Sequence, residues 1–229
     1  MSRPGVTIAV LIGAFIIVLA FVIAWQSKCK TSEAAPISNS TQAGSPMVAS
    51  GPLGALASQV REAGTKDKTV EKIKDEKTSA EIAKTISDKN APIGERVAAL
   101  ELSEYSDRPE VAVALKSACT DENASIRSAA VAVAAKRSSP DSLPTIMQAA
   151  KDKDAGVRRS AAYALADRNE KDALKSLVAL LDDEDSLVRK VASGALSKKA
   201  SQDFGYKYYA SGAERVEAVK KWQNWVEAK

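Results

Sequence analysis

An arginine that recurs every 31 residues constrains the fold of this chain more than any other feature. The four positions are Arg96, Arg127, Arg158 and Arg189. A small residue follows each arginine by three positions, at Ala99, Ala130, Ala161 and Ala192. A fixed period of this length is typical of architectures in which each repeat is one supersecondary unit. The spacing therefore predicts a stack of similar units within residues 66–229.

Each unit is predicted to be a pair of helices. Apolar side chains recur at spacings of three and four around the arginines, and again in the other half of the unit, where Leu143 and Ile146 align with Leu174 and Leu177. This period indicates amphipathic α-helices. One pair cannot bury both apolar faces alone, so neighbouring pairs must stack. We expect an all-α fold, a short α-solenoid of about four helix pairs plus capping helices.

The turn before each arginine carries a motif. The pattern D-x-D-x-x-V-R-x-x-A-A-x-A-L is followed by residues 152–165, and by residues 183–196 except for Ser193 at its second alanine. The preceding unit follows the first part of the pattern at Asp121, Asn123, Ile126, Arg127 and Ala130. It resembles HEAT repeats, particularly the short phycobilisome-lyase-like type of bacterial proteins, over about residues 79–229. The first unit departs, with Asn90 and Pro92 in place of the aspartates. The resemblance implies a solenoid with an extended binding surface, but this fold class hosts many functions.

Both ends of the stack are predicted to be capped. Before the first unit, apolar residues at helical spacing predict an N-terminal cap: Val70, Ile73, Ile82, Ala83 and Ile86. The last segment resembles the closing segment of bacterial HEAT-repeat proteins, a Gly-Tyr turn followed by a Trp-containing cap helix. One face of that helix is expected to cover the end of the stack, formed by Val216, Val219, Trp222 and Trp225.

The N-terminal region predicts a membrane anchor. After a short tail at residues 1–5, Val6 to Trp25 contains no charged residue. A helix of this length reaches roughly 30 Å, the thickness of the bilayer hydrocarbon. The alternative is a cleaved signal peptide, whose apolar region is usually shorter. We expect one transmembrane helix over residues 6–25, followed at 26–65 by a flexible linker rich in Ser, Ala, Gly and Pro.

The sequence gives little indication of which side of the membrane the soluble domain faces. Arg3 and the terminal amine on one side of the apolar segment nearly balance Lys28 and Lys30 on the other, so the positive-inside rule gives little direction. Linkers of this composition are common outside bacterial membranes. We therefore expect a single-pass membrane protein whose soluble domain is extracytoplasmic.

Several function classes are disfavoured by composition. The chain has no histidine, which excludes imidazole-based triads and zinc sites of the Cys/His type. Cys29 and Cys119 have no metal-ligand spacing, and no nucleophile-elbow or phosphate-loop motif occurs. We expect no catalysis, metal, cofactor or small-molecule substrate. A net charge of only +4 also disfavours nucleic acid as a partner.

Two further columns of basic residues could form a partner-binding face. Arg137, Arg168 and Lys199 are again spaced by 31 residues, and Arg159 and Lys190 form a parallel column that begins at Ser128. The resemblance implies that the main arginines pair with turn aspartates, and that their helices line the concave side. The two columns with Tyr163 would then form a mildly basic groove for an acidic peptide. A solvated charged face is the alternative.

The expected function is that of a membrane-tethered scaffold or adaptor that binds other proteins. Tethering raises the effective concentration of the repeats for partners at the same membrane. One alternative is a structural accessory subunit of a larger membrane complex. A lyase-like enzyme remains a third reading, because the family that the repeats resemble includes chromophore lyases, although no residue can be assigned to such chemistry.

Overall fold

A computed structural model describes residues 51–63, 68–137 and 142–229, which belong to one compact unit, Pro46–Lys229. Over these ranges the chain is helical and contains no strand. The predicted tail and transmembrane segment, residues 1–25, lie outside the described residues. Within the described ranges, no helix is long and apolar enough to cross a membrane.

The described residues form eleven α-helices and one short 3-10 helix. In chain order they are α2 (Pro52–Ala63), α3 (Lys68–Ile73), α4 (Glu76–Ser87), α5 (Ile93–Ser103), α6 (Pro109–Ala118), α7 (Ala124–Lys136), α8 (Ser142–Ala149), α9 (Ala155–Ala166), α10 (Lys171–Ala179), η1 (Leu180–Asp182), α11 (Ser186–Ala200) and α12 (Gly212–Glu227).

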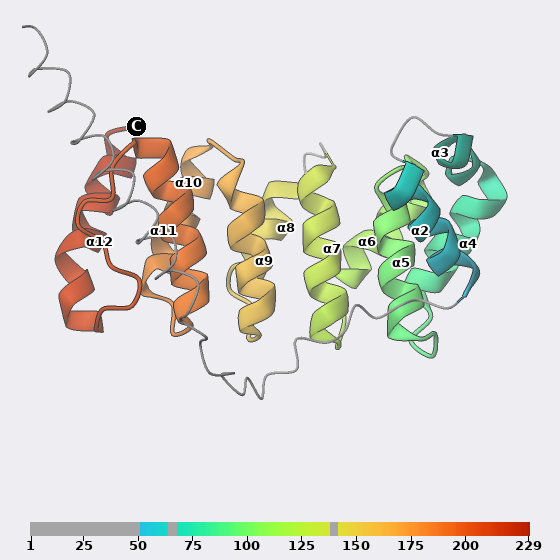
Figure 1. Cartoon of the computed structure of the whole chain (residues 1–229), viewed down its shortest axis with the longest axis horizontal. Coiled ribbons are helices and arrows are strands. Elements are labelled where there is room, and N and C mark those ends of the chain that lie inside the picture. The colour runs from blue at the N-terminus through green and yellow to red at the C-terminus, as the bar shows by residue number, and fades with distance from the viewer. Residues whose placement is uncertain (1–50, 64–67, 138–141) are drawn as a thin grey trace, which may run out of the picture. The chain divides into compact units, whose positions relative to one another are not determined.

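The helices form two layers of a repeat stack. The arginine-bearing helices α5, α7, α9 and α11, here called the arginine row, stand side by side, with α6, α8 and α10 behind them (Figure 1). Each member of the row packs on the next, and each also packs on the helix that follows it in its own unit, up to α10. This arrangement confirms the all-α helical repeat that the 31-residue period predicts.

Small and β-branched side chains explain the close packing of the row. Ala130, Ala161 and Ala192 are completely buried, as are the apolar residues that precede the arginines, Ile126, Val157 and Val188. Alanine lets adjacent helix backbones approach, and interiors are packed tightly enough that added methylene groups would force a shift. The repeated alanine therefore sets the spacing of the row.

The apolar core consists of two clusters that meet at α7. One cluster extends from α2 to α7 and includes Val133, whereas the other extends from α7 to α12 and includes Val131. In the second layer, α4 packs extensively on α6, but no comparable packing joins α6 to α8. In the second layer, packing is therefore tighter between α4 and α6 than between α6 and α8.

The end of the expected linker is helical rather than flexible, which corrects its predicted boundary at residue 65. Helix α2 packs on α5 and buries Leu53, Ala57 and Val60. Its apolar residues lie at spacings of four and three, a helical pattern obscured by the surrounding Gly, Ser and Ala. The helix therefore caps the arginine row at its N-terminal end.

Glu95 fixes the start of α2. It occupies the position that Ile126, Val157 and Val188 hold in the other units, and its carboxylate accepts hydrogen bonds from the backbone N–H groups of Gly51 (2.7 Å) and Gly54 (3.4 Å). A carboxylate at a helix N-terminus is favoured by the helix dipole. A Cβ at Gly51 would lie 2.6 Å from the Glu95 Cδ atom, so this approach requires glycine.

Replacing Glu95 by alanine is expected to lower the free energy of unfolding by about 1–3 kcal/mol, because it leaves two backbone donors without their acceptor. Hydrogen exchange should show the loss of protection in α2 first. Glu101→Ala is the matched control. It removes the exposed pair between Arg61 and Glu101 (2.8 Å) at the same helix contact, and should cost less than about 1 kcal/mol. Equal effects of the two variants would contradict this role of Glu95.

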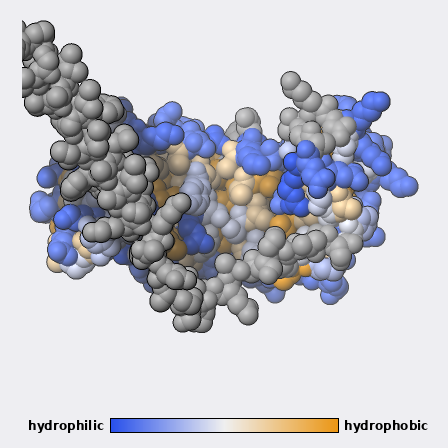
Figure 2. All heavy atoms as spheres, in the orientation of Figure 1, coloured by the Kyte–Doolittle hydropathy of each residue, from blue (hydrophilic) through white to orange (hydrophobic). Residues whose placement is uncertain are grey.

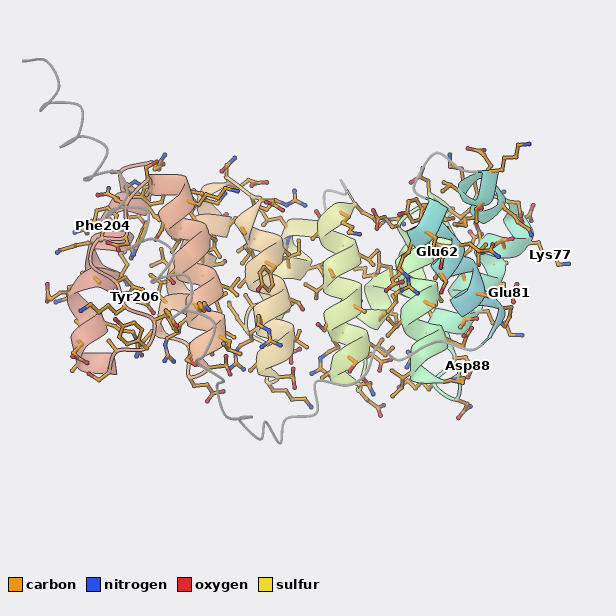
Figure 3. The ribbon with its side chains drawn as sticks, viewed as in Figure 1. Glu62, Lys77, Glu81, Asp88, Phe204 and Tyr206 are labelled. Carbon is orange, nitrogen blue, oxygen red and sulfur yellow. The ribbon has the colours of Figure 1, made fainter. Side chains whose placement is uncertain are left out.

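The two caps agree with expectation in part. At the N-terminal end, Val70, Ile73, Ile82 and Ile86 are buried as predicted. At the C-terminal end, Gly205 has a φ of 76°, and the loop that contains Phe204 and Tyr206 leads into α12 (Figure 3). The buried face of α12 consists of Arg215, Ala218, Trp222 and Val226, with Val219 and Trp225 partly buried.

Val216 does not belong to this face, which is a correction. It is 46% exposed, whereas its neighbour Arg215 is buried. Arg215 is held there because its guanidinium donates to the carbonyl of Ala210 (2.6 Å) and to the carboxylate of Asp182 (2.9 Å). A polar side chain with its own partners therefore takes the position that hydrophobicity alone would assign to valine.

Candidate functional site

The four period arginines form a ladder of bonds between consecutive units. The guanidinium of Arg158 donates from Nε and Nη2 to the two carboxylate oxygens of Asp183, at 2.7 and 2.9 Å, and from Nη1 to the carbonyls of Asp152 and Lys153. Arg127 repeats this geometry with Asp152 in the next unit. The predicted pairing with turn aspartates is confirmed, and the partner belongs to the following unit.

The ladder differs at its two ends. Arg96 contacts Asp121 through Nη2 alone (2.6 Å), and its Nε and the same Nη2 donate to the carbonyl of Ile86. At the last step the guanidinium of Arg189 donates to the backbone carbonyl of Tyr208 (2.7 Å), because the C-terminal loop replaces a further unit. The ladder thus joins the repeats to the C-terminal loop.

The ladder aspartates also organise the turns. Asp152 and Asp183 accept hydrogen bonds from the backbone N–H groups of Asp154 and Asp185, and Asp154 and Asp185 cap the N-termini of α9 and α11. A side-chain acceptor at this position satisfies an otherwise unpaired helix N–H group. In the D-x-D element of the motif, the first aspartate therefore pairs with an arginine and the second caps a helix.

Pairing shifts the acid–base properties of the ladder. Hydrogen bonding to Arg127 lowers the pKa of Asp152 below its ordinary value, although burial opposes the shift. Hydrogen bonding to Asp183 raises the pKa of Arg158 above its ordinary value. Because the pKa of Asp152 falls on folding, this pairing stabilises the fold above the ordinary aspartate pKa, and the stabilisation is lost as the pH falls through the lowered folded value.

The second column of basic residues is used largely within the fold. Arg137 donates to the carbonyls of Ser103 and Ser106 (2.5 and 2.8 Å), and Arg168 donates to the carbonyl of Ala135 and the hydroxyl of Ser142. Each reaches back to the end of the preceding unit, where helix carbonyls lack partners. Bonds within the stack therefore account for both side chains.

Lys199, the third member of this column, also bonds within the stack. Its ammonium group donates to the side-chain oxygen of Asn169 at 3.0 Å. Burial lowers its pKa, and the nearby carboxylates of Asp167 and Glu170 oppose that shift. The three residues of the column thus lie along the contacts between consecutive units.

The other predicted residues come together in a groove between α9 and α11. Arg159, Tyr163 and Lys190 line a hollow of about 550 Å³, together with the basic residue Lys198 and apolar residues. Tyr163 is 61% exposed and Leu187 is 48% exposed, so both side chains are accessible from solvent in this groove. Figure 2 shows apolar surface over the middle of the arginine row, whereas the end near α3 and α4 is strongly hydrophilic.

Lys198 was not predicted, although the helical period could have identified it. Arg159 and Tyr163 are separated by four residues, as are Lys190, Gly194 and Lys198, so each series lies on one face of its helix. Lys199 is one residue further and is rotated away by about 100°. The 31-residue spacing aligns residues between units, but it does not state which face of the helix they share.

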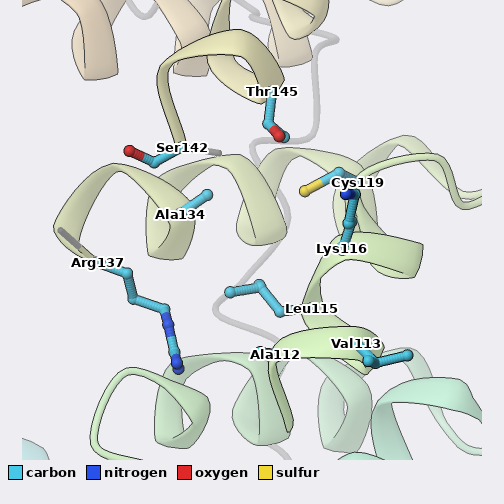
Figure 4. A pocket seen from close by; sticks show the side chains of 9 residues that line it. All are labelled: Ala112, Val113, Leu115, Lys116, Cys119, Ala134, Arg137, Ser142 and Thr145. Carbon is cyan, nitrogen blue, oxygen red and sulfur yellow. The ribbon is translucent and has the colours of Figure 1, made fainter. Parts of the chain in front are cut away.

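A separate cavity lies between the helices of the second layer. It has a volume of about 330 Å³ and is lined by α6, α7 and the start of α8, with Leu115, Cys119 and Ala134 among its residues (Figure 4). Cys119, which follows the last residue of α6, is only partly buried. Burial nevertheless raises the pKa of its thiol to about 11, so the thiolate is scarce at neutral pH.

No group of three or more Cys, Asp or Glu side chains that could hold a metal ion occurs among the described residues. The acidic side chains of the turns are instead engaged by the arginines and by helix N-termini. In the part of the chain that the structure describes, the arrangement provides a repeat stack with an open groove between α9 and α11.

Comparison with known families agrees with this fold. A family model described as HEAT repeats matches residues 112–197, from α6 into α11. No curated protein matches the chain. The match and the all-helical architecture support a HEAT-repeat protein, a class whose repeats generally mediate protein–protein interaction. The match includes α9 and most of α11, the helices that form the groove.

Proposed function

We propose that this protein is a membrane-tethered scaffold that binds other proteins through the groove between α9 and α11 and catalyses no reaction. The observation that carries the proposal is the exposed Tyr163, which lies in a hollow on a rigid repeat stack. Tyrosine is enriched at binding hot spots because it offers a large contact area with a polar end. The match to HEAT repeats supports the same class of function.

The proposed anchor is the uncharged segment Val6–Trp25, with the repeat unit outside the cytoplasm. An anchor would confine the groove to one membrane surface, where its partners would be bound at a raised effective concentration. Protease added to intact cells should release the repeat unit if it is extracytoplasmic. Full protection until the membrane is permeabilised would place the unit on the other side.

Affinity purification of the full chain from mild detergent tests the scaffold role. The expected result is soluble partners in less than stoichiometric amounts, which are lost from a Tyr163→Ala variant. The matched control is Tyr209→Ala, which removes another exposed tyrosine (69%) that does not line the groove. Recovery of a stoichiometric membrane complex, unaffected by Tyr163→Ala, would instead establish a structural accessory subunit.

A further inference from the structure

The groove between α9 and α11 carries basic side chains on both walls. Arg159 comes from α9, and Lys190 and Lys198 come from α11. In the described part of the chain, neither Arg159 nor Lys198 has a carboxylate partner, which contrasts with the paired arginines of the ladder. The ammonium group of Lys190 lies 5.7 Å from the centroid of the Tyr208 ring and has no carboxylate partner among the described residues. These charges are therefore available to an added anion.

The space between the walls is open because of one glycine. Gly194 aligns with Tyr163 of the preceding unit, and a Cβ built at Gly194 would meet no atom within 4 Å. The remaining lining is apolar and includes Val191, Ala195 and Leu187. The groove thus combines a hollow that can take an apolar side chain with a basic rim.

The neighbouring helix contact lacks this combination. Between α7 and α9, Ser128 of α7 holds the position that Arg159 of α9 holds in the groove. The hydroxyl of Ser128 lies 2.6 Å from the hydroxyl of Ser160. Ala132 holds the position of Tyr163. The combination of basic side chains from both helices with Tyr163 facing a glycine position therefore occurs between α9 and α11 and not between α7 and α9.

We infer that this groove binds an acidic peptide segment of a partner protein, with carboxylates against Arg159, Lys190 and Lys198 and an apolar side chain over Gly194 beside Tyr163. The inference rests on the proposed function and specifies the chemistry of its partner. A buried apolar anchor with a charged rim is a common design of protein interfaces, in which charge sets orientation and association rate.

A peptide fits these features better than a nucleic acid. Nucleic acid binding depends on many phosphate contacts made by a concentrated basic surface. Here three bases surround an apolar hollow, and the chain's net charge is only +4. The expected salt dependence is correspondingly moderate.

The test measures binding of a fluorescein-labelled peptide of alternating glutamate and leucine to the purified full chain in mild detergent, by fluorescence anisotropy. The wild-type chain should bind it, and a glutamine–leucine peptide of the same length should bind about tenfold more weakly or less. The double variant Arg159→Glu/Lys190→Glu should weaken binding of the acidic peptide by at least about tenfold. The control Lys220→Glu/Lys221→Glu, on exposed α12 positions outside the groove, should leave it unchanged.

Gly194→Phe gives a second, independent test. The substitution fills the hollow without meeting neighbouring atoms at Cβ, and most residues are better helix formers than glycine, so the fold should keep its stability. Binding of the acidic peptide should nevertheless fall by about tenfold or more, since the apolar anchor loses its place. Circular dichroism and thermal unfolding of the variant establish that it is folded.

Three outcomes would overturn the inference: equal binding of the two peptides, binding unchanged by Arg159→Glu/Lys190→Glu or by Gly194→Phe, or tighter binding of a single-stranded oligonucleotide than of the acidic peptide. These outcomes are distinct from failure of the proposed function. If protein partners are still captured through Tyr163 while the acidic peptide is not bound, only the partner chemistry is wrong. If the full chain captures no protein through the groove, the scaffold role itself fails.

Discussion

Replacing Arg158 by alanine is expected to lower the free energy of unfolding by about 3–5 kcal/mol, because it breaks a buried charge pair from one side. The side chains of Arg158 and Asp183 are only 9% and 6% exposed. Without the guanidinium, the Asp183 carboxylate keeps only the backbone N–H of Asp185 as a donor among the described residues, and the carbonyls of Asp152 and Lys153 lose the guanidinium in a site that water reaches poorly. Urea unfolding followed by far-UV circular dichroism measures the loss.

The next residue along the chain supplies the control. Arg159 is partly exposed and has no carboxylate partner among the described residues, so Arg159→Ala should change the free energy of unfolding by less than about 0.5 kcal/mol. Binding of the acidic peptide should show the reverse order, because Arg159 lines the groove and Arg158 does not. Two adjacent arginines would thus separate a structural role from a binding role.

A double-mutant cycle identifies the cause of the loss. If Arg158 acts mainly through Asp183, the double variant Arg158→Ala/Asp183→Ala should be more stable than the sum of the two single effects predicts, because no unpaired charge remains. Additive losses would mean that Arg158 stabilises the stack mainly through its aliphatic stem and the carbonyls. A loss below about 1 kcal/mol for Arg158→Ala would contradict a structural ladder.

Periodicity is the reason that most of the fold could be predicted. A repeat of 31 residues places equivalent side chains in equivalent surroundings, so the alanines that follow the arginines are expected to share the same burial, as they do. The pairing of Arg127 and Arg158 with turn aspartates was implied by the family resemblance, and the structure assigns the partners to the following unit. The prediction weakened where periodicity ends. Arg189 meets a backbone carbonyl of the C-terminal loop, a partner that no side-chain pattern encodes.

The helix α2 was missed for a different reason. Its Gly, Ser and Ala residues are typical of linkers, and the helix is stabilised from outside by Glu95 and by packing on α5. Tertiary contacts override local propensity in such short helices. Glu95 at a position that is apolar in other units was the available signal, since a carboxylate there requires a donor.

The candidate groove was predicted in part. Arg159, Tyr163 and Lys190 converge as expected, but Arg137, Arg168 and Lys199 serve the contacts between units. Both columns have the same 31-residue spacing, so the spacing could not separate them. The distinction depends on the phase of the 3.6-residue helical turn and on which helix end lies nearby.

Replacing Trp222 by alanine is the second change with a large expected effect, about 3–5 kcal/mol of unfolding free energy. Trp222 is completely buried, and its ring packs edge-on against Phe204 (4.7 Å between centroids) and Trp225 (5.5 Å). Truncation leaves a cavity in the cluster that joins α12 to the end of the stack. A terminal unit without its cap exposes apolar surface, so the loss should be accompanied by aggregation.

Trp222→Phe separates the packing of the ring from its polar group. Within the described residues the indole N–H of Trp222 has no hydrogen-bond acceptor, so phenylalanine removes an unpaired buried donor while keeping an aromatic ring. Its cost should therefore be well below that of alanine. Tyr209→Ala, at a 69% exposed position in the neighbouring loop, should cost less than about 0.5 kcal/mol.

Hydrogen exchange locates the effect of Trp222→Ala. In a repeat stack each unit contacts only its neighbours, so lost protection should appear in α12, α11 and α10 and decline towards α4. Equal loss along the whole stack would mean that the units unfold as one cooperative block. Unchanged protection in α10 would show that α12 is an appendage, and that the cap of this stack must be sought elsewhere than in the aromatic cluster of Trp222.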